Sequence, residues 1–217
     1  MHTALCLCAD IPRVEVSTRV VVLMHWREVY RRSNTARIAC LALSNSALHL
    51  RGLAAAPLDT APLVADCPHP ALLYPTADAV TLTPELASTW SRPLTLFVPD
   101  GNWRQASKVA TREAALAHVP RFKLPPGPAS AYRLRHSPHA DHLCTFEAIA
   151  RALGILEGDA VREVLEALLA KMVERVLWTR GMGRREAPTG APTSLASPTS
   201  LSSALTVPGT RRGSVCT

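Results

Sequence analysis

The sequence predicts an α/β fold with a mainly parallel sheet flanked by helices. Short aliphatic or β-branched runs, each ended by turn residues, are typical of buried strands, and residues 19–24 and 94–98 are the clearest examples. Segments whose apolar residues recur at helical spacing alternate with these runs along the chain. The length of 217 residues and the hydrophobic content of 47% allow a core of substantial size.

In the N-terminal half, each predicted strand is followed by a helix or by a turn-rich stretch. After the first strand, Ser33 or Asn34 is expected to cap a helix that continues through Leu43. Irregular, proline-rich structure is expected at 54–70. The further predicted strands are 47–51, 71–74 and 94–98.

The C-terminal half is predicted to be mostly helical. A helix is expected over 103–118, and Asp159 is expected to cap a long helix with regularly spaced apolar residues. Between them are predicted, in order, a four-proline loop at 120–128, a short strand at 132–135 and an amphipathic helix at 145–156. Ala, Pro, Ser, Thr and Gly predominate in 184–217, so this tail is predicted to be disordered.

The balance of charge favours a polyanionic partner only modestly. The chain has a net charge of +7, and the tail contributes four arginines against one glutamate. The part before the tail therefore carries +4, which by itself does not identify a nucleic-acid-binding protein. The sequence shows no secretory signal, no membrane-spanning run and no disulfide framework among its six cysteines, so a cytoplasmic setting is expected.

The segment 94–108 is the most informative part of the chain. It combines a buried strand, an Asp-Gly turn and the start of a helix at Trp103. Ligands of open α/β sheets bind at the carboxyl ends of the strands, which is where Asp100 is expected. The helix start offers free N–H groups and a positive dipole end beside Arg104 and Lys108. A site for a polar or anionic ligand is therefore predicted here.

Three further local patterns accompany this segment in a fixed order. They are His25-Trp26-Arg27-Glu28 with Arg31-Arg32-Ser33-Asn34-Thr35-Ala36-Arg37, then Ser130-Ala131-Tyr132-Arg133-Leu134-Arg135, then Cys144-Thr145-Phe146-Glu147-Ala148. Together with Asp100-Gly101-Asn102-Trp103 they resemble the DTW-domain family, roughly over residues 6–180. The resemblance implies a catalytic domain at 19–183, preceded at 1–18 by a remnant of an N-terminal cysteine-containing segment.

Two features depart from the family pattern. The family's signature turn is Asp-x-Thr-Trp, and here Asn102 replaces the threonine with another small side chain that suits turn geometry. Many relatives begin with a cysteine cluster that looks zinc-binding, whereas this chain has Cys6 and Cys8. Two cysteines cannot complete a tetrahedral site, so zinc binding is left open, with His2 as a further candidate ligand.

The resemblance also implies a fold and a reaction. Members of the family include tRNA-uridine aminocarboxypropyltransferases, which use S-adenosylmethionine, and they look like relatives of the SPOUT methyltransferases, whose parallel sheet carries a trefoil knot. N3 of a uridine in tRNA attacks the γ-carbon of the methionine part, and methylthioadenosine leaves. The attacking imide must lose a proton, and Asp100 is expected to be the base. The structural alternative for Asp100 is a turn former beside Gly101.

The other site residues are expected on the strength of the resemblance and of their places near the carboxyl edge of the sheet. The expected donor-binding residues are Val98, Pro99, Gly101, Asn102, Trp103, Tyr132, Arg135 (facing the methionine carboxylate), Thr145 and Glu147. The expected RNA-binding residues are His25, Arg27, Glu28, Arg31, Arg32, Asn34, Thr35, Arg104 and Lys108.

Several of these residues have structural alternatives. Trp103 is expected to pack into the core, in preference to stacking on a base or on adenine. Thr145 and Glu147 suit a helix start without any ligand. Three histidines spaced three residues apart are expected to be surface residues and not metal ligands: His136, His139 and His142.

Two rival functions stay open. An RNA methyltransferase of the SPOUT class would release S-adenosylhomocysteine in place of methylthioadenosine. A non-catalytic RNA-binding module would bind no S-adenosylmethionine, although an aromatic content of 5% supplies few stacking platforms for such a module. The choice between tRNA and ribosomal RNA, and the oligomeric state, are not predicted.

Overall fold

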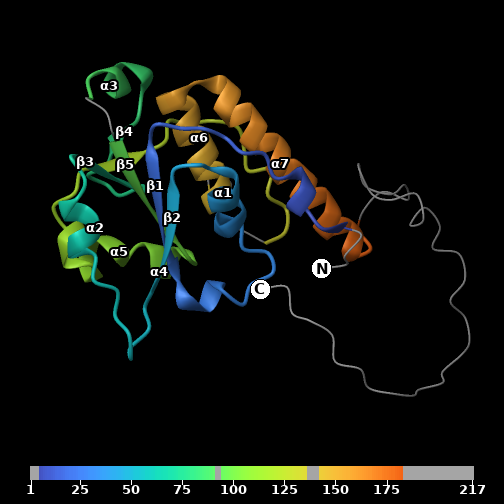
Figure 1. The fold of residues 1–217 in the computed structure, drawn as a ribbon, viewed down its shortest axis with the longest axis horizontal. Helices are drawn as coiled ribbons and strands as arrows, with labels where there is room; N and C mark the ends of the chain where they lie inside the picture. Colours follow the sequence, from blue (N-terminus) through green and yellow to red (C-terminus); the bar gives the residue numbers. More distant parts are fainter. Residues whose placement is uncertain (1–4, 91–93, 136–141, 183–217) are drawn as a thin grey trace, which may run out of the picture.

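One parallel sheet forms the centre of the molecule. The computed structural model describes residues 5–90, 94–135 and 142–182, and the tail predicted to be disordered lies outside these residues (Figure 1). Six strands follow the order β2-β1-β5-β3-β6-β4, and every neighbouring pair is parallel, which confirms the predicted fold class. The strands are β1 (Arg19–His25), β2 (Ser46–Arg51), β3 (His69–Leu73), β4 (Val80–Thr81), β5 (Leu94–Asp100) and β6 (Arg121–Lys123).

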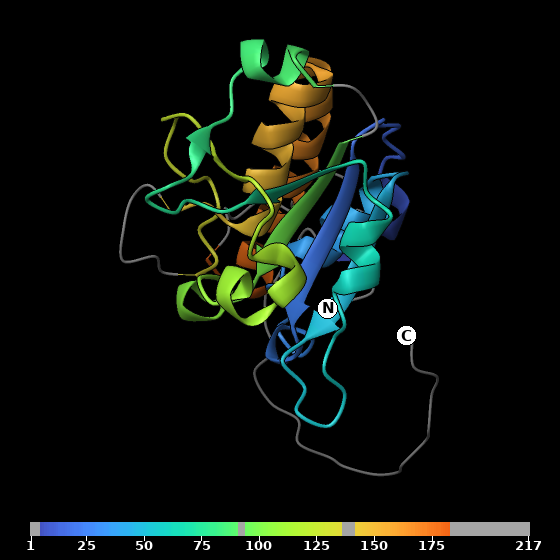
Figure 2. The ribbon, with the colours of Figure 1, turned by 90° about the vertical axis from the view of Figure 1, so that its left-hand side faces the viewer.

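Helices cover both faces of this sheet. In Figure 1, α2 and α5 lie on one side of the strands and α1, α6 and α7 on the other, and Figure 2 views these layers from the side of α2 and α5. The helices are α1 (Ala36–Ala42), α2 (Ala61–Ala65), α3 (Pro84–Ser88), α4 (Trp103–Ala106), α5 (Val109–Arg112), α6 (Thr145–Glu157) and α7 (Asp159–Thr179). Short 3-10 turns are η2 (Cys8–Asp10), η3 (Trp26–Glu28) and η4 (Ala114–Leu116).

The alternation of side chains along the central strands fills two cores. Val20 and Val22 of β1 belong to the core beneath α1, α6 and α7, whereas Val21 belongs to the core beneath α2 and α5. All seven residues of β5 are buried. A parallel strand between two helical layers must be apolar on both faces, which is why 19–24 and 94–98 could be recognised as strands.

The helix predicted over 103–118 is wrong as a single element. The chain instead forms α4, α5 and η4, with an extended backbone at Glu113. Arg51 explains the break, because its Nη1 donates to the carbonyl of Gln105 at 3.4 Å and its Nε pairs with Glu113 Oε1 at 2.9 Å. A buried ion pair from a distant strand thus overrides local helix propensity.

The strand predicted at 132–135 is also wrong. Glu147 Oε1 accepts the N–H of Ala131 at 2.7 Å, and Ser130 Oγ accepts the N–H of Tyr132 at 3.1 Å. Side chains therefore satisfy backbone donors that a neighbouring strand would otherwise pair.

Three other stretches differ from expectation. The four-proline loop at 120–128 contains β6, which lies in the proline-free run after Pro120; the carbonyls of Phe122 and Lys123 accept the N–H groups of Tyr74 and Leu82. The stretch 54–70 contains α2 and the start of β3, and β4 and α3 lie between residues 75 and 93, where no element was expected.

The two long C-terminal helices pack closely. Gly158, with a φ of +107°, is the cap of α7, and Asp159 begins the helix and pairs with Arg162 at 3.0 Å, which corrects the predicted capping role of Asp159. A Cβ at Gly154 would lie 2.9 Å from Arg162 Cβ, so α6 needs a glycine where α7 turns back against it.

Candidate active site

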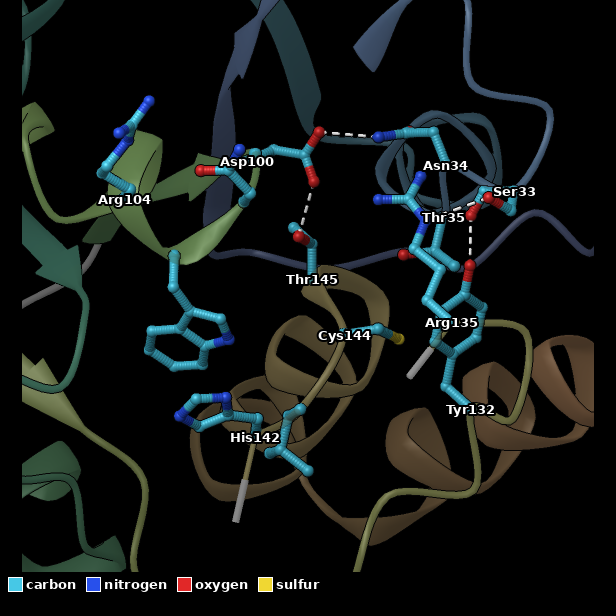
Figure 3. A pocket seen from close by; sticks show the side chains of 14 residues that line it. Ser33, Asn34, Thr35, Asp100, Arg104, Tyr132, Arg135, His142, Cys144 and Thr145 are labelled. Carbon is cyan, nitrogen blue, oxygen red and sulfur yellow. Dashed lines mark hydrogen bonds between the residues drawn. The ribbon is translucent and has the colours of Figure 1, made fainter. Parts of the chain in front are cut away.

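A pocket opens at the carboxyl edge of the sheet, where α4 begins. Its volume is about 500 Å³. Four stretches that are distant in sequence line it, and each belongs to one of the four quoted patterns or lies directly before one (Figure 3). The lining residues are Ser33, Asn34, Thr35, Asp100, Gly101, Asn102, Trp103, Arg104, Tyr132, Arg135, His142, Leu143, Cys144 and Thr145.

Asp100 ends β5 at the inner wall of this pocket and is 5% exposed. Thr145 Oγ1 donates to its Oδ1 at 2.5 Å, and Asn34 Nδ2 donates to its Oδ2 at 2.7 Å (Figure 3). Burial raises the pKa of this carboxyl; the two hydrogen bonds oppose that shift, and the nearby Glu28 carboxylate adds to it. The arrangement is a buried, oriented carboxylate whose proton affinity exceeds that of an ordinary aspartate.

Arg135 connects the pocket wall to a second buried carboxylate. Its Nη2 lies 2.9 Å from Glu28 Oε2, and its Nε donates to Ser33 Oγ at 3.0 Å. Glu28 is 4% exposed and also accepts from Asn34 Nδ2 at 3.5 Å. Tyr132 donates its hydroxyl hydrogen to the carbonyl of Ser33. The β1–α1 connection and the 130–135 segment are thereby fixed to one another.

Trp103 faces the pocket, so the prediction that it packs into the core is wrong. It is 39% exposed, and its ring stacks on His142 with centroids 3.8 Å apart and planes 28° apart. Tyr74 flanks it at 5.8 Å. Arg104 also lines the pocket, but its guanidinium points away from Asp100 (Figure 3). An aromatic wall therefore stands opposite the polar group around Asp100.

Comparison with known proteins identifies the family of this chain. A model of the DTW domain matches residues 1–177. The chain belongs to the DTW domain family. Proteins named tRNA-uridine aminocarboxypropyltransferase 2 are 32% identical over 158 residues in Drosophila melanogaster and 27% identical over 167 residues in Mus musculus. These alignments cover 70% and 74% of this chain and 62% and 56% of the relatives, so the chain spans less than two thirds of their length.

No solved structure matches the chain. Within residues 5–90, 94–135 and 142–182, no helix has the length and apolar character that crossing a membrane requires.

The structure explains how this DTW domain accommodates Asn102 in the signature turn. Asn102 caps α4: its Oδ1 accepts the N–H of Gln105 at 2.9 Å, and Gln105 Oε1 accepts the N–H of Asn102 at 2.9 Å. Asparagine and threonine are both good capping residues, so either can begin this helix. At Gly101 an added Cβ would lie 3.0 Å from Gln105 Oε1, so a side chain there would press on this cap.

Several expected site residues of the DTW domain lie outside the pocket lining. Val98 and Pro99 are buried in β5 and carry Asp100 to the edge of the sheet. Glu147 is 4% exposed, and its carboxylate accepts from Ser130 Oγ at 2.6 Å and from the N–H of Cys144 at 3.0 Å. It therefore holds the pocket wall from behind.

The expected RNA-binding residues divide into two groups. Asn34 and Thr35 line the pocket, and Asn34 serves two purposes: its Oδ1 accepts the N–H of Arg37 in the first turn of α1 at 3.3 Å, while its Nδ2 holds Asp100. Thr35 is the capping position of α1. Arg104 also lines the pocket. The others are not part of the lining: Arg27, Arg31, Arg32 and Lys108 are exposed, Glu28 is buried, and His25 contacts Gln105 at 3.3 Å.

Four lining residues were not among the expected site residues: Ser33, His142, Leu143 and Cys144. Ser33 and Cys144 each directly precede an expected residue within a quoted pattern, which was a usable signal. Cys144 caps α6 in place of Thr145, and burial raises the pKa of its thiol to about 12, so it is a neutral group of the wall. His142 is not an isolated surface residue, whereas His136 and His139 lie outside the described residues.

Cys6 and Cys8 are exposed thiols near the start of the described chain. Among the residues that the structure describes, no three His, Cys, Asp or Glu side chains gather as metal ligands would. His2 lies outside those residues, so zinc binding stays an untested prediction.

Proposed function

We propose that this protein transfers the 3-amino-3-carboxypropyl group of S-adenosylmethionine to N3 of a uridine in tRNA and releases methylthioadenosine. The observation that carries the proposal is the buried Asp100 carboxylate, held by Asn34 and Thr145 in a pocket built from four DTW patterns. The relatives' name, tRNA-uridine aminocarboxypropyltransferase 2, supports the reaction class.

The residues of the pocket fit such a donor. Its volume of about 500 Å³ lies within the range of small-molecule sites, about 300–1,000 Å³. The partly exposed face of Trp103 suits adenine. The guanidinium of Arg135 suits the methionine carboxylate, because arginine has five N–H donors and can hold Glu28, Ser33 and a further anion together.

Asp100 acts as the base. The donor supplies a carbon attached to a good leaving group, a sulfonium. The N3–H proton of uridine passes to an oxygen of Asp100 while the N3–Cγ bond forms and the Cγ–S bond breaks, its electron pair remaining on sulfur. Asp100 then returns the proton to water. A carboxyl with a raised pKa is a better proton acceptor for a weakly acidic imide than an ordinary aspartate.

The remaining DTW residues position these groups. Glu28 orients Arg135, Glu147 orients the 130–132 segment, and the Asn102 cap fixes the start of α4. The trefoil knot implied by the family resemblance is part of the proposal.

The test is mass spectrometry of nucleosides from tRNA incubated with purified protein and S-adenosylmethionine. The expected result is a uridine enlarged by one aminocarboxypropyl group, with an equal amount of methylthioadenosine. S-adenosylhomocysteine with a methylated nucleoside would establish the methyltransferase alternative. Folded protein that gives no product and shows no heat of binding with S-adenosylmethionine would favour the RNA-binding module.

A further inference from the structure

One short stretch before the tail has a marked net positive charge. The tail from residue 184 accounts for +3 of the total of +7, which leaves +4 for residues 1–183. Residues 26–37 contain four arginines and one glutamate, a net charge of +3, so the other residues before the tail together contribute +1. The connection between β1 and α1 therefore carries a local excess of positive charge.

The arginines of this stretch face solvent, and its glutamate does not. The exposed arginines are Arg27, Arg31, Arg32 and Arg37. Glu28 is buried and paired with Arg135 at 2.9 Å, so its charge is directed inward. The outward face of the connection is consequently more basic than its composition indicates.

Tyr30 lies between Arg27 and Arg31 in the sequence and is 80% exposed. Trp26 lies four residues earlier, half-buried, with the guanidinium of Arg27 5.3 Å from its ring centroid. Single-stranded nucleic acids bind where cationic side chains follow the phosphates and aromatic rings stack on the bases. Tyrosine beside several arginines is the composition that such a surface requires.

The face is fixed relative to the pocket. The N–H of Arg31 donates to the carbonyl of Glu28 at 3.0 Å, and the N–H of Asn34 donates to the carbonyl of Arg31 at 2.9 Å. Glu28 pairs with Arg135, and Asn34 donates to Asp100. The turn that carries Tyr30 is therefore bonded at both of its ends to residues that line the pocket. Figure 1 shows this connection at the end of the sheet where α4 begins.

We propose that Tyr30 is a stacking platform for an unpaired base next to the target nucleotide, with Arg27, Arg31 and Arg32 binding the phosphates around it. This inference rests on the proposed function and narrows its substrate to uridines in single-stranded segments. The chemistry agrees, because uridine N3 is a Watson–Crick atom that a base pair occupies. An acceptor uridine must be unpaired, and its neighbours in a loop are then free to stack.

The test is fluorescence anisotropy with a labelled ten-nucleotide oligouridylate, alone and annealed to oligoadenylate. Wild-type protein is expected to bind the single strand more tightly than the duplex. Tyr30→Ala should raise the Kd for the single strand about tenfold, whereas Tyr30→Phe, which keeps the ring, should bind like wild type. The double variant Arg31→Gln with Arg32→Gln should lower the slope of log Kd against log salt by about 1.4, because each lost phosphate contact removes about 0.7.

Arg13→Gln is the matched control. Arg13 is exposed and precedes β1, at the opposite edge of the parallel sheet, so its loss should leave the Kd unchanged. Isothermal titration with S-adenosylmethionine should give wild-type affinity for Tyr30→Ala, which shows that the pocket remains intact.

Three results would overturn the inference: an unchanged Kd for Tyr30→Ala, an equal loss for Tyr30→Phe, or binding of phosphatidylserine vesicles without binding of the oligouridylate. The transfer assay separates this outcome from failure of the proposed function. Normal transfer by wild type together with an unchanged Kd for Tyr30→Ala rejects the platform and leaves the transferase. If Tyr30→Ala binds the single strand more weakly but wild type transfers nothing, the transferase is rejected and the RNA-binding surface is retained.

Discussion

Asp100→Asn is expected to separate proton transfer from folding and from donor binding. Asparagine has the shape of aspartate, so its Oδ1 can accept from Asn34 while its Nδ2 donates to Thr145 Oγ1, which is free to act as an acceptor. Both neighbours thus keep a partner. What the variant loses is the ability to take a proton from uridine N3.

The size of the effect follows from this reasoning. A positioned general base contributes about 100- to 10,000-fold to a rate, which corresponds to about 3–5 kcal/mol of transition-state free energy. The affinity for S-adenosylmethionine should change far less, because the aromatic wall and Arg135 remain. Asp100→Ala is the contrast: the buried amide of Asn34 loses its nearer acceptor and keeps only Glu28 at 3.5 Å, and the hydroxyl of Thr145 loses its acceptor, so a loss of stability of about 1–3 kcal/mol is expected.

The pH dependence has a definite sign. Burial places the pKa of Asp100 above the ordinary aspartate value of 3.8, and the base must be deprotonated to act. Transfer should therefore decline as the pH falls through the raised pKa, at a higher pH than an ordinary aspartate would give. For stability the sign is opposite: the folded state binds the proton more tightly, so the stabilising contribution is complete below 3.8 and lost as the pH rises through the folded value. At neutral pH Asp100→Asn should unfold at the same or a higher temperature than wild type.

The assay is single-turnover transfer to tRNA across a pH series, with thermal unfolding and titration of S-adenosylmethionine on the same samples. Near-normal transfer by Asp100→Asn, with the acid limb of the pH profile still present, would refute the role of Asp100 as the base. A large loss of affinity for S-adenosylmethionine in Asp100→Asn would show that the carboxylate binds the donor and does not act only as the base.

Three further predictions concern the cap, a buried ion pair and the aromatic wall. Asn102→Thr should keep the urea midpoint of wild type, because threonine also caps a helix. Asn102→Ala should lower the midpoint and reduce the free energy of unfolding by about 1 kcal/mol, because alanine cannot cap. Glu113→Ala should destabilise the protein by about 3–5 kcal/mol because it leaves the buried guanidinium of Arg51 unpaired, while Glu174→Ala on the exposed face of α7 should stay within about 0.5 kcal/mol. Trp103→Ala should weaken binding of S-adenosylmethionine about tenfold in isothermal titration, and Trp103→Phe should retain most of the affinity.

Each of these predictions can fail clearly. Equal urea midpoints for the two Asn102 variants would show that the cap contributes nothing. Equal urea midpoints for Glu113→Ala and Glu174→Ala would show that the ion pair between Arg51 and Glu113 does not stabilise the break between α4 and η4. A change of less than twofold for Trp103→Ala would exclude stacking on adenine.

The sequence by itself determined the central strands and the place of Asp100. Strand burial appears as a run of apolar residues, and an Asp-Gly turn marks where the strand ends, so β1, β5 and the edge that carries Asp100 could be predicted from local signals. The same holds for α6, whose apolar spacing and early Glu147 are features of a single segment.

Only the tertiary structure decided how these segments act on one another. Arg51 pairs with Glu113 and breaks the helix after Trp103, and Glu28 pairs with Arg135 across 107 positions of sequence. The raised pKa of Asp100 likewise depends on burial by several distant segments. Such contacts depend on chain closure over long separations, and they leave no periodicity or turn signal in the neighbouring residues. For this reason the sequence could place the Asp100 carboxylate, while its burial, its raised pKa and the aromatic wall opposite it became evident only in three dimensions.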